Sequence, residues 1–262
     1  MLTDSPKYAP GATLSGKYRL TRKLGEGAFG EVWMCEDAIS RGEVVVKLLH
    51  AQWSRVPSVV ERFRREALAS QRIQHPSACR VFEFGTADDG TPYITMEYLG
   101  GGTLKQELSK QGRLPLARVA KWMVPVCEAV AVAHKAGIVH RDLKPENIMM
   151  KHTGGDEVPV VLDFGIAKLL DADQKLTQTG SILGSPAYMS PEQSMGQADI
   201  GPAADTYSMA IIVFELVTGA PPFVSKSFAE MAVKHAHDPA PPLTGVPRQL
   251  ADVVARCLGK DP

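Results

Sequence analysis

The sequence predicts an α+β protein in which a small, strand-rich part with one helix precedes a larger, mainly helical part. Short runs of β-branched and apolar residues, separated by turn signals, fill the chain from residue 18 to residue 98. Three consecutive glycines at 100–102 interrupt regular structure, and beyond them apolar residues recur with a helical period. We therefore expect a first lobe over 18–98, a hinge over 97–102 and a second lobe over 103–262.

The composition and charge are those of an ordinary globular protein. Of the 262 residues, 44% are hydrophobic and 22% are charged, and 29 basic side chains balance 29 acidic ones. This balance does not favour a nucleic acid as a partner. The four cysteines are scattered without a Cys-x-x-Cys pair, which disfavours a zinc ribbon and suggests reduced thiols. With no signal peptide and no long apolar run, we expect a cytoplasmic chain without a membrane segment, although an anchor could follow residue 262.

A glycine-rich stretch, Gly25–Gly30, follows the first expected strand and a flexible leader over residues 1–17. Its spacing, G-x-G-x-x-G, fits either a dinucleotide-binding turn or a phosphate-binding hairpin. A dinucleotide-binding turn opens a helix, whereas residues 31–35 alternate like a strand and lead to a turn signal at Arg41-Gly42. We therefore expect a β-hairpin whose backbone can approach a phosphate chain closely.

A lysine lies inside the otherwise apolar strand pattern of residues 43–49. A buried ammonium group needs an anion, so Lys47 either reaches a phosphate group or extends past the strand edge to water. The next helix is expected to begin with a capping box at Ser58. On this helix, Glu66 either forms a surface pair with Arg62 or points inward and pairs with Lys47.

Further strands and helices follow in an order typical of an α+β fold. The pattern predicts strands around 81–84 and 93–98 before the glycines. After the glycines it predicts a helix that begins near Thr103, a long helix over 116–136 and a strand over 158–162. Most of the second lobe is therefore expected to be helical.

The stretch His140–Asn147 combines an acid, two bases of different reach and an amide within eight residues. It lies between two apolar runs, residues 138–139 and 148–150, that are expected to form short buried strands. Charged groups held between buried strands lose water and need partners. Taken alone, the stretch is either a polar surface turn or a loop whose charges receive ligands.

Six motifs occur in the order and spacing of the protein kinase signature set. They are the glycine hairpin followed by Val32, the strand lysine Lys47, the helix glutamate Glu66, His140–Asn147, Asp163-Phe164-Gly165 and Ser190-Pro191-Glu192. From Tyr18 onward the chain therefore resembles the protein kinase superfamily, and in particular the bacterial serine/threonine kinases related to the eukaryotic ones. The resemblance implies the two-lobed protein kinase fold and transfer of the γ-phosphoryl group of ATP to protein hydroxyls.

The resemblance implies catalytic roles for four residues. Asp142 would accept the proton of the attacking hydroxyl, and Lys144 would neutralise charge on the γ-phosphoryl group. Lys47 would contact the α- and β-phosphates, and Glu66 would orient it. Because phosphoryl transfer asks a protein mainly for positioning and charge neutralisation, these residue types suit the reaction.

The resemblance also implies ATP and Mg²⁺ as cofactors, with Mn²⁺ as an alternative. Asn147 and Asp163 would hold the metal. ATP would be bound by the glycine hairpin, the neighbouring strands and the expected hinge, through Leu24, Gly25, Glu26, Gly27, Ala28, Phe29, Gly30, Val32, Val45, Lys47, Met96, Glu97 and Leu99. Among these, Met96 would be the gatekeeper of the adenine pocket.

The resemblance assigns residues 163–192 to an activation segment. Thr177 and Thr179 would be autophosphorylated, the alternative being an ordinary polar loop, and Arg141 would pair with the added phosphate. Ser185 would lie in the loop that seats the substrate residue. A homodimer could serve phosphorylation between two molecules, and other partners would be protein substrates with Ser or Thr residues.

Members of the family continue beyond the point at which this chain stops. They carry a further helix with an arginine that pairs with the residue corresponding to Glu192, so we expect a domain truncated at its C-terminal end. Two alternative functions are a pseudokinase that binds nucleotide without transfer and a small-molecule phosphotransferase. The intact set of catalytic residues disfavours the first, and the peptide-seating loop over 184–192 disfavours the second.

Overall fold

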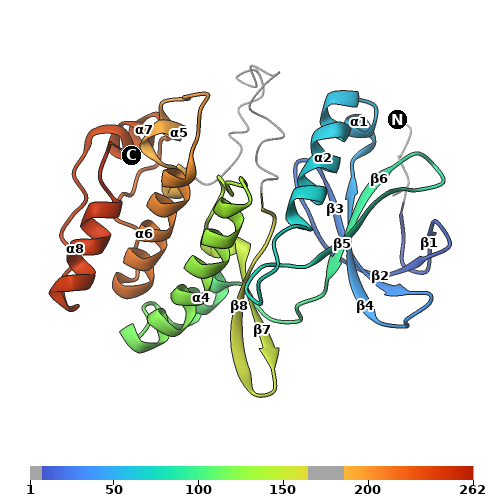
Figure 1. Ribbon diagram of the computed structural model, residues 1–262, viewed down its shortest axis with the longest axis horizontal. Coiled ribbons are helices and arrows are strands. Elements are labelled where there is room, and N and C mark those ends of the chain that lie inside the picture. The colour runs from blue at the N-terminus through green and yellow to red at the C-terminus, as the bar shows by residue number, and fades with distance from the viewer. Residues whose placement is uncertain (1–7, 165–185, 262) are drawn as a thin grey trace. The chain divides into compact units, whose positions relative to one another are not determined.

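The computed structural model describes residues 8–164 and 186–261. The chain forms two compact units (Figure 1). The first unit consists of Met1–Arg72 and Cys79–Leu99, and the second consists of Ile73–Ala78 and Gly100–Pro262. Among the helices that the structure describes, none has the length and apolar character needed to cross a membrane.

The first unit is built on an antiparallel sheet of six strands in the order β1-β2-β3-β4-β6-β5 (Figure 1). The strands are β1 (Thr13–Leu14), β2 (Tyr18–Glu26), β3 (Gly30–Asp37), β4 (Glu43–Leu49), β5 (Val81–Thr86) and β6 (Pro92–Glu97). Their positions agree with the strand pattern of the sequence, because β-branched and aromatic residues fit a pleated, half-buried surface.

The expectation of a flexible leader over residues 1–17 is wrong for its second half. Thr13–Leu14 form β1, which pairs with β2 through Leu14 and Tyr18. The Leu14 side chain is buried in the core together with Tyr18 and Leu20, and this burial stabilises the short strand. A strand of two residues carries no periodicity that the sequence alone could reveal.

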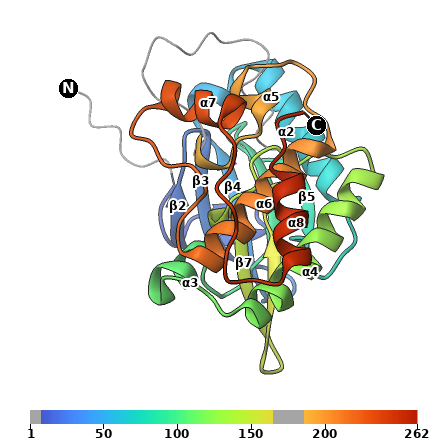
Figure 2. The same cartoon turned by 90° about the vertical axis from the view of Figure 1, so that its left-hand side faces the viewer.

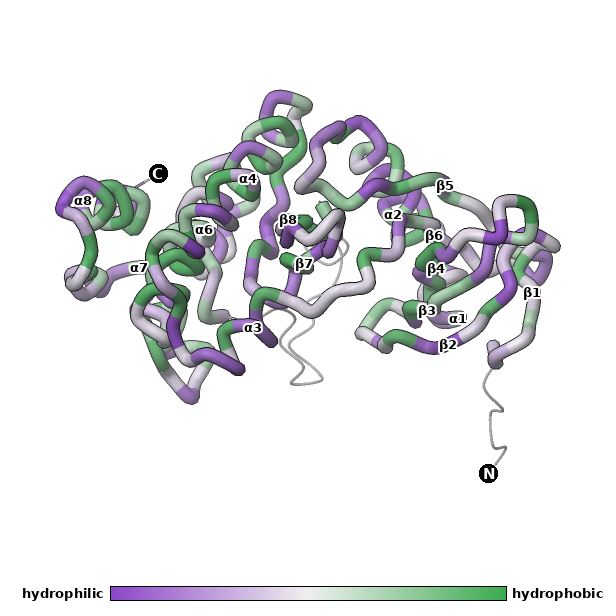
Figure 3. Tube along the Cα trace, turned by 90° about the horizontal axis from the view of Figure 1, so that it is seen from below, coloured by the Kyte–Doolittle hydropathy of each residue, from purple (hydrophilic) through white to green (hydrophobic). Residues whose placement is uncertain are grey.

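The two faces of the sheet differ in their surroundings, as the alternation of side chains along β4 shows. Val44, Val46 and Leu48 point into a core cluster on one face. The other members of this cluster come from β1, β2, β3, β6 and the turn after β5: Leu14, Tyr18, Leu20, Trp33, Cys35, Ala87 and Tyr93. Figure 3, coloured by hydropathy, shows hydrophobic residues along β4. The odd-numbered positions of β4, including Lys47, therefore face the opposite side.

Two helices follow β4 in the first unit, the short α1 (Ala51–Ser54) and α2 (Pro57–Ser70). The expected capping box at Ser58 is wrong, because α2 begins one residue earlier with Pro57 and has no side-chain cap. Proline is favoured at this first helical position, since its φ angle is already helical and its missing N–H would have no partner there. The carboxylate of Glu61 instead binds Arg64 and Arg65 on the surface of the helix.

The second unit is mainly helical and contains a two-stranded hairpin. Its elements are α3 (Leu104–Gln111), α4 (Leu116–Lys135), η1 (Pro145–Asn147), β7 (Ile148–Thr153), β8 (Asp156–Val161), η3 (Pro186–Tyr188), α5 (Pro191–Ser194), α6 (Pro202–Thr218), α7 (Phe228–His237) and α8 (Arg248–Cys257). Helix α6 lies between α4 and α8 and packs against both (Figures 1 and 2). The α6 helix is mostly buried, which gives the second unit a rigid centre.

Residues 138–139 do not form the expected strand, because the backbone after α4 turns directly into the stretch that begins at His140. The glycines that follow Leu99 are held against β7. A Cβ atom on Gly101 would lie 1.6 Å from the carbonyl oxygen of Met150, and the N–H of Met150 donates to the carbonyl of Gly102. Within the second unit, the close approach of the two backbones therefore explains a glycine at position 101.

A buried histidine on α7 predicts a pH dependence of stability. His235 is fully buried between the rings of Tyr207 and Phe223. Burial, together with the charge of Lys260, lowers the pKa of His235 to about 4. Since an unfolded histidine titrates near 6.5, the unfolded chain binds a proton between pH 6.5 and 4 that the folded chain does not. The free energy of unfolding should fall by about 3 kcal/mol as the pH drops through this window.

Urea unfolding of the protein and of the variant His235→Gln between pH 7 and pH 4 measures this contribution. The variant retains polar atoms next to Tyr207 but has no group that titrates in this window. Its free energy of unfolding should depend less steeply on pH than that of the parent. Parallel pH profiles of the two proteins would contradict the assignment.

Candidate active site

Five of the residues expected to contact a nucleotide share one face of the sheet in the first unit. Strand pairing places Gly25 opposite Val32, and Val32 opposite Lys47, across β2, β3 and β4. In the adjacent row, Val45 pairs with Met96 on β6. Directly paired residues of antiparallel strands point to the same side, so these five residues line the face opposite the core cluster.

The glycine-rich stretch forms a β-hairpin between β2 and β3, as expected. The N–H of Gly27 donates to the carbonyl of Gly30 at 2.9 Å and closes the turn. A Cβ atom on Gly25 or Gly27 would meet no atom within 4 Å, whereas one on Gly30 would lie 1.9 Å from the carbonyl oxygen of Leu48. Gly30 is therefore required by the strand pairing itself, and the first two glycines leave the backbone open to a ligand.

This contrast between the glycines predicts opposite effects of two alanine substitutions. Gly30→Ala should destabilise the protein by about 1–3 kcal/mol, because the new methyl group overlaps the backbone of β4. Gly27→Ala should leave the free energy of unfolding nearly unchanged and weaken ATP binding. Thermal unfolding and ATP titration of both variants test this, and equal melting temperatures for the two would contradict it.

The remaining residues of the hairpin lie at the surface of the first unit. Leu24, Glu26 and Ala28 are exposed, and Phe29 is half-buried. Lys47 is half-buried in β4, and Glu66 lies on the buried side of α2 with 8% of its surface exposed. The burial of Glu66 favours an inward orientation over a surface pair with Arg62, and a pairing of Glu66 with Lys47 stays a prediction.

The expected hinge residues lie at the end of β6. Met96 and Leu99 are buried, and the carboxylate of Glu97 accepts a hydrogen bond from the N–H of Arg80 at 2.8 Å. A second bond runs from the N–H of Glu97 to the carbonyl of Arg80. No sequence pattern indicated this role, in which the Glu97 side chain binds the residue that precedes β5.

In the second unit, the charged groups of His140–Asn147 converge on one carboxylate. Lys144 Nζ lies 2.7 Å from Asp142 Oδ2, and the Asn147 side-chain amide donates to the same oxygen at 3.1 Å. The amide also donates to the main-chain carbonyl of Asp142 at 2.8 Å. Both side-chain contacts fall on Oδ2, and the described residues give Oδ1 no hydrogen bond. One carboxylate oxygen of Asp142 is therefore held by two side chains, and the other is left as a hydrogen-bond acceptor.

His140 has an architectural position. Its Nδ1 accepts a hydrogen bond from the N–H of Asp142, and its Nε2 donates to the carbonyl of Leu162 at 2.8 Å. A ring that accepts at one nitrogen and donates at the other is neutral. The ring also packs edge-on against Phe164 at a centroid distance of 5.2 Å. His140 thus ties the stretch to Leu162 and Phe164, the two neighbours of Asp163 in the chain.

A buried carboxylate on α6 holds the backbone at the start of the same stretch. Asp205 is fully buried and accepts hydrogen bonds from the N–H groups of His140 and Arg141, each at 2.8 Å. It also lies 2.7 Å from His134 Nε2 on α4. His134 was not among the predicted residues, because a histidine near the end of a helix has no distinguishing sequence pattern.

Arg141 is fixed in two further ways. Its guanidinium group donates to the carbonyl of Ile200 at 2.9 Å, and its own carbonyl accepts from the Gln193 side chain at 2.6 Å. Its φ angle is +68°, and that of Asp163 is +54°. This backbone conformation is costly for residues with a side chain and occurs often at functional sites, where the surrounding structure enforces it.

Two side chains provide oxygen atoms that suit a divalent cation. The β7–β8 hairpin brings their backbones together, since the N–H of Leu162 donates to the carbonyl of Asn147 at 2.8 Å. The Asn147 amide nitrogen is turned toward Asp142, which leaves its oxygen as a ligand atom. With the carboxylate of Asp163, this gives the hard oxygen donors that Mg²⁺ prefers, and the residues fit the expected metal.

Three predicted residues, Thr177, Thr179 and Ser185, lie outside the described residues. Of the motif that follows them, Ser190 caps α5 by accepting a hydrogen bond from the N–H of Gln193. The capping of α5 therefore explains a serine at position 190. Glu192 is buried, with 6% of its surface exposed.

Comparisons with known proteins agree with the resemblance of the motifs. A family profile described as "Protein kinase domain" matches residues 18–262. The serine/threonine-protein kinase PknA of Mycobacterium tuberculosis is 37% identical over 257 residues, which cover 96% of this chain and 58% of that protein. The serine/threonine-protein kinase pkn3 of Myxococcus xanthus is 38% identical over 269 residues, which cover 99% of this chain and 49% of that protein. The chain spans about half the length of these curated relatives.

A solved structure gives the same result for the fold. The crystal structure of the PknI kinase domain of Mycobacterium tuberculosis matches with a TM-score of 0.71 at 29% sequence identity. The match covers 97% of this chain and 92% of that one. The predicted fold class, a β-sheet lobe with one helix followed by a mainly helical lobe, is thereby confirmed.

Proposed function

Because this chain belongs to the protein kinase family, we propose that it transfers the γ-phosphoryl group of ATP to serine and threonine hydroxyls of proteins. The observation that carries the proposal is the arrangement at Asp142. Lys144 and Asn147 both contact one carboxylate oxygen and leave the other to a substrate hydroxyl. The relatives are named serine/threonine-protein kinases, which supports serine and threonine hydroxyls as the acceptors.

The chain's own residues would perform three tasks in the reaction. Asp142 would orient the attacking hydroxyl and take up its proton as the new bond to phosphorus forms. Lys144, already beside this carboxylate, would balance negative charge on the phosphoryl group as it moves. Lys47, on the nucleotide-facing side of β4, would hold the α- and β-phosphates in position.

Mg²⁺ is the metal that this proposal requires, with Mn²⁺ as the alternative. Asn147 and Asp163 would hold it, and when bound it would neutralise charge on the phosphates. Regulation belongs to the same proposal: phosphorylation of Thr177 or Thr179 would add charge that pairs with Arg141. A homodimer for phosphorylation between molecules, a cytoplasmic location and the boundaries of the lobes and hinge stay predictions.

Incubation of the protein with γ-labelled ATP and Mg²⁺ tests the proposal. We expect label on the protein itself, located by mass spectrometry at Thr177 or Thr179, and on a generic basic protein that contains serine and threonine. Nucleotide binding without transfer would indicate a pseudokinase. Transfer to small alcohols but never to a protein would indicate a small-molecule phosphotransferase, and either result would refute the proposal.

A further inference from the structure

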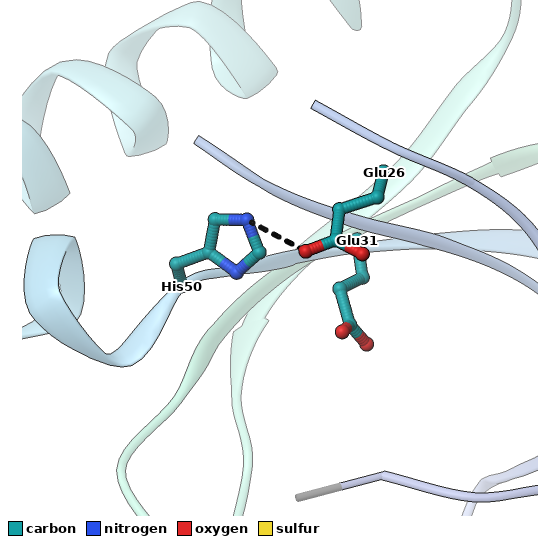
Figure 4. Close-up of side chains that lie close together, drawn as sticks. All are labelled: Glu26, Glu31 and His50. Carbon is teal, nitrogen blue, oxygen red and sulfur yellow. Dashed lines mark ion pairs between the residues drawn. The ribbon is translucent and has the colours of Figure 1, made fainter. Parts of the chain in front are cut away.

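A cluster of two acidic side chains and a histidine lies beside the glycine hairpin in the first unit. Glu26, Glu31 and His50 offer ligand atoms that all lie within 4.8 Å of one another (Figure 4). These atoms already have partners. Lys23 and Trp33 donate to the Glu31 carboxylate at 2.9 and 2.8 Å.

The His50 ring is committed as well. Its Nε2 lies 3.0 Å from the carbonyl oxygen of Gly27 and 3.7 Å from a carboxylate oxygen of Glu26. A carbonyl oxygen can only accept, so Nε2 carries a hydrogen and has no lone pair for a metal. The ring nitrogen that faces Glu26 is thus held by the hairpin, and the contacts of His50 lead to the carbonyl groups at the hairpin tip.

Three consecutive carbonyl groups at the tip of the hairpin accept hydrogen bonds from the segment that follows β4. The carbonyl of Gly27 faces His50 Nε2, and the carbonyl of Ala28 accepts from Trp53 Nε1 at 3.0 Å. The carbonyl of Phe29 accepts from the main-chain N–H of His50 at 2.7 Å. The rings of Phe29 and Trp53 also pack together at a centroid distance of 5.6 Å.

These bonds fix the direction of the N–H groups in the hairpin. In a trans peptide, the C=O of one residue and the N–H of the next lie in one plane and point in opposite directions. Holding the carbonyls of Gly27 and Ala28 against α1 therefore turns the N–H groups of Ala28 and Phe29 away from it. Among the residues that the structure describes, neither of these N–H groups has a hydrogen-bond partner.

The anchor of these bonds is rigid and adjoins the strand that carries Lys47. His50 follows directly after β4, and the Ser54 hydroxyl at the end of α1 contacts the carbonyls of Leu49 and His50. The segment His50–Trp53 is thereby held at a constant position relative to the sheet. A hairpin attached to it keeps a constant position relative to Lys47.

We infer that His50 and Trp53 are positioning residues that brace the glycine hairpin so that its Ala28 and Phe29 N–H groups are directed at the phosphates of ATP. The inference rests on the proposed function, since it takes ATP to be the ligand of the hairpin. It concerns affinity for the phosphate chain, because these hydrogen bonds end on the hairpin tip, whereas Val45 and Met96 pair in β4 and β6.

Binding of ATP and of adenosine to the full chain separates this role from general stabilisation. Trp53→Phe keeps the ring contact with Phe29 but removes the N–H donor, and His50→Ala removes the other side-chain donor. Each variant should bind ATP about three- to ten-fold more weakly, and the double variant more weakly still. Affinity for adenosine, which has no phosphates, should be unchanged, so the ratio of the two affinities should fall.

Two further variants serve as rescue and control. His50→Gln places an amide N–H at a similar reach and should restore most of the ATP affinity. Gln52→Ala changes an exposed residue of the same short helix and should leave both affinities as they are. Equal losses for ATP and adenosine, or no loss, would overturn the brace while ATP binding and transfer by the parent protein leave the proposed function standing. A parent protein that neither binds ATP nor transfers its γ-phosphoryl group would refute both.

Discussion

The variant Asp142→Asn should transfer phosphoryl groups about 10²- to 10⁴-fold more slowly than the parent protein. The amide cannot take up the proton of the hydroxyl, although it has nearly the same shape and can still accept a hydrogen bond from Lys144. Because Asp142 lies 33% exposed at the surface of the second unit, the substitution should change the free energy of unfolding little. ATP affinity should also be retained, since the nucleotide contacts come from other residues.

Single-turnover measurements with γ-labelled ATP give the rate, and titration with ATP gives the affinity. Asp156→Asn is the matched control, because Asp156 is an exposed aspartate of the same unit that also contacts a lysine, Lys121. It should transfer at the parent rate. If Asp142→Asn and Asp156→Asn were equally active, Asp142 would not be the residue that accepts the proton.

The nucleotide-facing side of the sheet could be predicted from the sequence, because the patterns that identify it lie within single strands. The run Val44–Leu49, apolar except for Lys47, locates β4, and the position of Lys47 in the run shows which face of the strand it occupies. Once β3 and β4 pair, Val32 lies next to Lys47 without any further information. The alternation of side chains with a period of two therefore predicts most of the strands of the first unit and the faces that they expose.

The parts that the sequence did not predict depend on contacts between distant residues. Nothing near His134 indicates that it meets Asp205, which lies 71 positions later. Nothing near Arg141 indicates that Gln193 holds its carbonyl. The apolar pair at 138–139 was expected to form a strand, because a short apolar run does not show whether it has a strand partner.

The hydrogen bonds of Asp205 lead to the second large effect that we expect. Asp205→Asn should lower the free energy of unfolding by about 3 kcal/mol and slow phosphoryl transfer at least ten-fold. One carboxylate oxygen accepts from the N–H of Arg141, and the other accepts from the N–H of His140 and lies next to His134 Nε2. An amide has only one oxygen, so its NH₂ group must face a buried donor in either orientation.

The effect on the rate follows from the backbone of Arg141. Its positive φ angle is unfavourable, and the bond from its N–H to Asp205 helps to hold it. Without that bond the chain can relax toward a negative φ angle, which would displace the neighbouring Asp142. Urea unfolding and single-turnover transfer measure the two consequences separately.

A second substitution distinguishes the backbone bonds from the contact with the histidine. His134→Ala removes one partner of Asp205 but leaves both backbone N–H groups bound to the carboxylate. It should therefore destabilise the protein while retaining most of the transfer rate. If His134→Ala slowed transfer as much as Asp205→Asn, the contact with His134, and not the two backbone bonds, would be what holds Asp142 in its reactive position.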